Sequence, residues 1–294
     1  MKASSFVAVP APMRPLMSRS MLAVAAACSL VAIPAAADDK DPRPAAGIQD
    51  NSFLIEEAYN QEPGSVQHTA TLQRRQGRDW FFDFTQEWPL GSQDHQFSYS
   101  VPYSWIRNDD DQRVQGFGDV TLKYRYQAWY ENEFLPAFAP SLSLILPTGS
   151  KSKGLGDGSY GLEALLPFSK IVSDRVTLHA NAGMTHLFDV DGQSPTSYKL
   201  GGSTIYAVTR DFNFMLEALG EWEESVNELR EIERQFTFTI NPGFRYAVNF
   251  RDESQLVMGF SVPIALSRGT APDYGLFFYL SYEHDFLPKK NKKK

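Results

Sequence analysis

The side chains of this sequence that could do chemistry are mainly charged groups at alternating positions of short segments. Asp83 and Glu87 lie in one such segment, and Lys123 and Arg125 lie in another. Because alternate residues of a β-strand face the same side of a sheet, each pair would point in one direction. Charges on the inner face of a closed sheet can pair with one another or line an aqueous path. The pattern indicates a polar passage rather than a catalytic centre.

Metal and cofactor sites are not indicated by the sequence. Acidic clusters occur at 108–111 and 189–192, but neither has the spacing through a final Glu that defines an EF-hand loop. Walker, Rossmann and zinc-ligand patterns are absent. The formal net charge is −7, which disfavours nucleic acid as a partner. We therefore predict no metal, no cofactor and no nucleic-acid partner.

The elements that would carry these charges are segments of about ten residues in which apolar and polar positions alternate, as in two-faced strands. Trp80, Phe82 and Phe84 form one face of the clearest segment, and the other face is polar. Phe, Tyr and Trp dominate the apolar faces near the segment ends, as in the aromatic girdles of membrane barrels. We predict an all-β fold, a transmembrane antiparallel up-and-down β-barrel of about 12 strands over residues 65–286. The alternative is a soluble β-sandwich.

The lengths of the connections support a barrel whose two termini lie in the periplasm. Long connections are expected outside and short ones inside, and they alternate along the sequence, except for a tight first outside hairpin at 76–77. The expected outside connections are 107–118, 147–158, 189–197, 223–234 and 267–273; the inside ones are 88–94, 131–136, 169–174, 209–211 and 247–253.

Three further segments flank the predicted barrel. Basic residues ahead of an apolar run from Met21 to Ile33 predict a cleaved signal peptide over residues 1–37. Residues 38–64 are expected to be a periplasmic leader or a plug in the lumen, and 287–294 a basic periplasmic tail. Phe286 has the alternation of a final-strand aromatic residue, and we expect it to be the signal for the assembly machinery.

In each strand the polar residues alternate with the apolar ones. If the apolar set (the apolar phase) contacts lipid, the polar set (the polar phase) faces the lumen. The predicted lumen-lining residues are Asp83, Glu87, Lys123, Arg125, Glu163, His179, Lys199, Glu217, Glu221, Arg245 and Glu283. Carboxylates outnumber basic groups in this set, and Asp285 adds another near the mouth. A narrow passage of this charge is expected to show weak cation preference.

Several motifs resemble the outer-membrane barrels of the phenol meta-pathway degradation transporter family. They are Gly-Phe-Gly-Asp at 116–119, Leu-Pro-Thr-Gly at 146–149, Gly-Leu-Gly-Asp-Gly at 154–158 and His-Ala-Asn-Ala-Gly at 179–183. The resemblance extends from about residue 116 to the C-terminus, and residues 53–59 differ from the family pattern. It implies a barrel and transport of small hydrophobic or aromatic compounds.

The residue types of these motifs suit turns better than ligand binding. Glycine permits positive φ and tight returns where strands leave the membrane, and a nearby Asp can accept backbone N–H groups of the turn. We therefore predict a structural role for Gly116, Gly118, Asp119, Gly154, Gly156 and Asp157.

Together these observations predict a passive outer-membrane channel or transporter for small hydrophobic or aromatic solutes, and not an enzyme. Its expected partners are outer-membrane lipid and lipopolysaccharide, the barrel assembly machinery and the solute. One alternative is a plugged structural or sensory barrel. A less favoured one is an outer-membrane lipase, for which His186 is the best-placed histidine, but Ser159 and Ser203 fall on the opposite phase. No catalytic residue is assigned.

Overall fold

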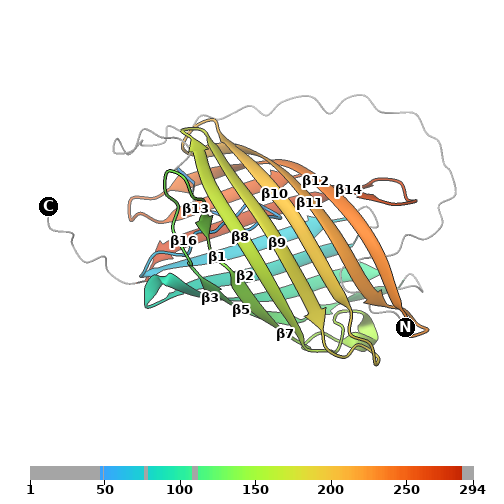
Figure 1. Cartoon of the computed structure of the whole chain (residues 1–294). Coiled ribbons are helices and arrows are strands. Elements are labelled where there is room, and N and C mark those ends of the chain that lie inside the picture. The colour runs from blue at the N-terminus through green and yellow to red at the C-terminus, as the bar shows by residue number, and fades with distance from the viewer. Residues whose placement is uncertain (1–46, 49, 76–78, 108–111, 287–294) are drawn as a thin grey trace, which may run out of the picture.

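The computed structural model describes residues 47–48, 50–75, 79–107 and 112–286, and the strands among them form one antiparallel sheet (Figure 1). The predicted signal peptide, the tail at 287–294 and the tips at 76–78 and 108–111 lie outside the described residues. Among those described, no helix is long and apolar enough to cross a membrane. The strands are β1 (Ser65–Arg74), β2 (Trp80–Leu90), β3 (Ser92–Arg107), β4 (Arg113–Phe117), β5 (Val120–Tyr126), β6 (Ala137–Phe138), β7 (Ser141–Leu146), β8 (Gly161–Ser173), β9 (Val176–Leu187), β10 (Thr196–Ala207), β11 (Phe212–Val226), β12 (Ile232–Asn249), β13 (Gln255–Ser261), β14 (Ile264–Ser267), β15 (Asp273–Tyr274) and β16 (Leu276–Asp285).

The sheet closes on itself because β1 pairs with β16, and this confirms the predicted barrel over the sandwich. Four barrel strands are interrupted and appear as the pairs β4 and β5, β6 and β7, β13 and β14, and β15 and β16. Pro140 lies in the second gap and Pro263 in the third, where the missing N–H breaks the ladder. With each interrupted strand counted once, the barrel has the predicted twelve strands.

The outer surface is apolar and the inner surface is polar, which is the reverse of a soluble protein. On β7, Leu142 and Leu144 face outward and are 54% and 38% exposed, whereas Ser143 between them is 0% exposed. Leu144 pairs with Leu162 on β8, so the apolar face is continuous from strand to strand. This arrangement suits a barrel whose exterior contacts lipid.

The observed connections agree with the expected pattern in most places. The turns from β2 to β3 and from β8 to β9 are short, and the connection from β7 to β8 is long. The expected outside loop at 223–234 is wrong, because β11 and β12 stay paired as far as Val226 and Ile232. Residues 113–117 of the expected loop 107–118 form β4, which pairs with the end of β3.

Candidate functional site

The barrel interior holds a segment of the chain itself, residues 47–48 and 50–64, which precede β1. Most of its bonded backbone amides donate to side chains of the barrel wall, and those of Asn51 and Glu57 donate to side chains of the segment itself. The N–H groups of Leu54 and Ile55 donate to Glu217 Oε1 at 2.8 and 3.0 Å, and the Glu56 N–H donates to Asn181 Oδ1 at 2.7 Å. We call residues 47–48 and 50–64 the inner segment.

Two buried arginines hold the carbonyl groups of the inner segment. Arg245 Nη1 donates to the carbonyl oxygens of Asp50 and Asn51, both at 2.8 Å. Arg125 Nη2 donates to the carbonyl oxygen of Tyr59 at 2.8 Å. Each arginine is only 1% exposed. Since a planar guanidinium presents several donors in a fixed fork, one side chain can hold consecutive carbonyls.

Neutral polar residues complete this set of contacts, and the sequence analysis missed them. The N–H groups of Ala58, Asn60 and Gln61 donate to Ser169 Oγ, Gln127 Oε1 and Gln96 Oε1 at 2.7, 3.2 and 2.8 Å. All three acceptors are buried. Gln96 and Ser169 lie on the polar phase of β3 and β8, so the alternation that identified the charged residues could also have found them.

The predicted lumen-lining charges divide between the inner segment and the wall. Lys123 forms an ion pair with Glu56 of the segment, whereas Lys199 pairs with Glu163 on the wall at 2.9 Å. Glu221 lies opposite Lys199 in the strand register and shares its face. These pairs place opposite charges together in the interior, where separate burial would be costly.

The other predicted lumen residues also have partners in the interior. Ser100 Oγ donates to Asp83 at 2.6 Å, Gln96 Nε2 donates to Glu87 at 2.7 Å, and His179 Nδ1 lies 2.7 Å from Ser169 Oγ. Glu283 is half-buried and lies opposite Gln67 in the register. Glu217 is fully committed to the inner segment and to Asn241 Nδ2, at 2.6 Å, so it is not a free charge of the passage.

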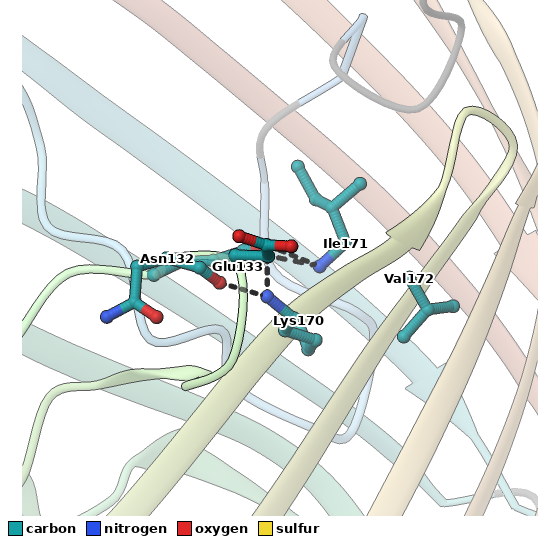
Figure 2. Close-up of a pocket in the computed structure, with 6 residues that line it drawn as sticks. Asn132, Glu133, Lys170, Ile171 and Val172 are labelled. Atoms are coloured by element: carbon teal, nitrogen blue, oxygen red, sulfur yellow. Dashed lines mark hydrogen bonds and ion pairs between the residues drawn. The ribbon is translucent and has the colours of Figure 1, made fainter.

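A hollow lies near the end of the barrel, beside β8, and one of the residues that line it contacts the inner segment (Figure 2). Glu131 accepts the backbone N–H of Ile171 at 3.1 Å, pairs with Lys170 at 3.3 Å, and accepts the Tyr59 hydroxyl at 2.5 Å. Lys170 also donates to the carbonyl oxygen of Asn132. These polar groups bond to one another. They therefore connect the loop between β5 and β6 with β8 and with the inner segment.

The geometry of a serine hydrolase is not present around His186. Its Nδ1 lies 2.8 Å from Thr196 Oγ1, and its ring meets that of Phe188 edge to face at 5.3 Å. Ser159 donates to the carbonyl oxygen of Tyr160, and Ser203 contacts Ser52 inside the barrel. Among the described residues, no group of three or more acidic, histidine or cysteine side chains is placed to hold a metal ion.

Residues 57–268 match the family described as "Putative MetA-pathway of phenol degradation". The match covers more than two thirds of the sequence. The chain belongs to this family. The match confirms the resemblance. It begins well before residue 116, where the first motif of the sequence analysis lies, and it ends at residue 268, short of the C-terminus to which the resemblance was expected to extend. No curated protein matches the chain.

Solved structures are similar to this family member at low sequence identity. An outer membrane channel from Pseudomonas putida F1 has a TM-score of 0.60 and 13% identity, covering 81% of this chain and 100% of that one. The NanC porin has a TM-score of 0.49 with 9% identity, covering 73% and 98%, and the KdgM porin 0.46 with 12%, covering 75% and 99%. The first of these similarities supports the barrel architecture.

Three of the four family motifs, at 116–119, 146–149 and 154–158, form one unit beside β4. Among the described strands β4 pairs only with β3, and the loop between β7 and β8 packs beside it. Asp119 accepts the N–H groups of Gly149 and Asp157 at 2.8 and 3.0 Å. A Cβ on Gly156 would collide with the Asp119 carboxylate, and a Cβ on Gly116, whose φ is 156°, would lie 2.8 Å from Leu155.

The acidic turn at Asp189 and Asp191 is held by its own chain. Asp189 Oδ1 accepts the Gly192 N–H at 2.9 Å, and Lys151 Nζ donates to Asp191 at 2.8 Å. That hydrogen bond and the lysine charge lower the pKa of Asp191 below its ordinary value. An exposed ion pair therefore joins this turn to the loop between β7 and β8. The cluster at 108–111 lies outside the described residues.

Proposed function

We propose that this chain is an outer-membrane passive channel or transporter for small hydrophobic or aromatic solutes. The observation that carries the proposal is a closed barrel with an apolar exterior and a polar interior, in a chain of a family described by phenol degradation. The fold it shares with a protein described as an outer membrane channel supports this function. Export through a signal peptide at residues 1–37 belongs to the same proposal.

The outer-membrane partners follow from the exterior of the barrel. We propose contact with lipid and lipopolysaccharide through the apolar belt, and recognition of the last strand by the assembly machinery. Phe286 follows β16, its N–H donates to the Gly64 carbonyl at 2.8 Å, and its ring lies 5.3 Å from that of Trp88. These contacts fix an aromatic side chain at the end of the barrel, where the proposed assembly signal is expected.

The second candidate function is a plugged structural or sensory barrel, and the inner segment favours it. The segment crosses the interior and bonds to strands on opposite sides, from Arg125 on β5 to Arg245 on β12. In the channel proposal the segment moves aside to open a path. Between Asp50 and Gln61 the segment is bonded to side chains of the wall, so movement of this part breaks no pairing between barrel strands.

Two measurements test the proposed function. In planar bilayers, the pure folded protein is expected to show small conductance steps with weak cation preference. Gram-negative cells that make the protein are expected to take up labelled phenol faster than cells with an empty vector. A folded protein that neither conducts nor raises phenol uptake would support the plugged barrel instead.

A further inference from the structure

The side chain of Phe53 lies in a niche on the inner wall of the barrel, between β12, β13 and β16. The floor of the niche is made of two glycines on the paired strands β12 and β13. A Cβ on Gly243 would lie 2.7 Å from Phe53 Cε2, and one on Gly259 would lie 2.5 Å from Phe53 Cζ. The aromatic ring therefore rests directly on backbone, and a side chain at either position would fill the place of the ring.

The sides of the niche are aromatic and apolar. The rings of Phe277 and Tyr279 on β16 both lie 5.5 Å from the ring of Phe53, tilted by 42° and 50°. Met215 and Val257 belong to the same buried cluster. Tilted rings at this separation attract one another beyond the burial of their area. The niche has the shape and chemistry of a site for one flat aromatic ring.

A polar group lies beside the niche and is occupied by the inner segment. The Tyr279 hydroxyl donates to Asp50 Oδ1 at 2.6 Å, and Asp50 belongs to the same segment as Phe53. The other carboxylate oxygen of Asp50, Oδ2, is buried without a hydrogen-bond partner among the described residues. When the segment leaves, the Tyr279 hydroxyl becomes free to bond a hydroxyl group carried by an incoming ring.

We propose that this niche is the binding subsite for the aromatic ring of the transported solute, and that Phe53 occupies it while the inner segment is docked. The proposal rests on the proposed function and names the part of the passage that selects aromatic solutes. A solute ring and Phe53 compete for one place, so binding of the solute favours the undocked state of the segment. The solute then helps to open its own path.

Binding of phenol to the purified full-length protein tests the subsite. Phe53→Ala removes the resident ring and is expected to bind phenol at least tenfold more tightly than the wild-type protein. Phe53→Ala combined with Gly259→Ala places a methyl group in the niche and is expected to lose at least tenfold of that affinity. A second variant combines Phe53→Ala with Phe277→Leu. It removes an aromatic ring from the side of the niche and adds no atom to the glycine floor, and it is expected to weaken phenol binding as well. Heat-modifiable migration in gels selects folded protein for each measurement.

The outcomes separate this subsite from the proposed function. If Phe53→Ala binds phenol no better than the wild type, or if neither Gly259→Ala nor Phe277→Leu weakens its binding, the subsite assignment is overturned. Phenol uptake by cells that make the wild-type protein is measured separately. Uptake without these binding differences would leave the channel intact and reject the niche, whereas the binding differences without uptake would reject the channel and retain a ring-binding site.

Discussion

Arg245 is expected to hold the inner segment in its docked position, and its removal should release the segment. Its Nη1 makes two hydrogen bonds of 2.8 Å, to the carbonyl oxygens of Asp50 and Asn51, and its Nη2 makes a longer one of 3.3 Å to that of Ile48. Hydrogen bonds to a charged group contribute about 1.5 to 3 kcal/mol each, so the loss of the two short ones at the low end costs about 3 kcal/mol. Since about 1.4 kcal/mol changes an equilibrium constant tenfold, Arg245→Met should raise the undocked population about 100-fold.

The assay follows the exposure of a buried position in the segment. Ser52 is 3% exposed, and the one cysteine of the sequence, Cys28, lies in the predicted signal peptide. Ser52→Cys therefore provides a single buried thiol, and its rate of reaction with a small maleimide should follow the undocked population. In the Arg245→Met background this rate should rise by about two orders of magnitude, in line with the population change.

Lys199→Met is the matched control, because it removes the same charge but breaks a hydrogen bond to the wall instead of one to a carbonyl group of the segment. Lys199 forms its ion pair with Glu163 on the wall, at 2.9 Å. Labelling in this variant should stay near the wild-type rate. If the labelling rate rises equally in the two variants, the loss of lumen charge releases the segment, and the hydrogen bonds from Arg245 to the carbonyl groups do not hold it in place. An unchanged rate in Arg245→Met would refute the reasoning.

Three further predictions concern the faces of the barrel, the outside loops and ion selectivity. Leu144→Arg on the apolar exterior should cost roughly 2 to 4 kcal/mol and depress assembly, whereas Glu163→Gln should be tolerated; equal tolerance in heat-modifiable gels would contradict the face assignment. Asp119→Ala removes the acceptor of two loop amides and should speed proteolysis at 147–160 with an unchanged melting temperature of the barrel. Glu223 lies two residues beyond Glu221 on the same face of β11. Replacing both with Gln should move the reversal potential toward anions, and no movement would place these carboxylates outside the conducting path.

The sequence by itself determined the strands and their two faces. The period of two in segments such as Trp80, Phe82 and Phe84 is a local signal, because each side chain faces away from its neighbours in the chain whatever the partner strand is. The same alternation identified Glu163, Lys199 and Arg245 as inward residues before any pairing was known. The turn role of Asp119 could also be expected from its motif, although the two amides that it accepts could not be named.

Only the tertiary structure decided what the inward residues contact. Residues 38–64 could be either a leader or a plug, because their composition suits both. Arg245 lies 195 positions from Asp50 in the sequence, and Glu217 lies 163 from Leu54, yet each pair is joined by a hydrogen bond. Such contacts depend on the tilt and stagger of the strands in the closed barrel, which set the height of every inward residue. No local pattern carries that information, so the contacts of the inner segment and the niche of Phe53 could be identified only from the tertiary structure of the closed barrel.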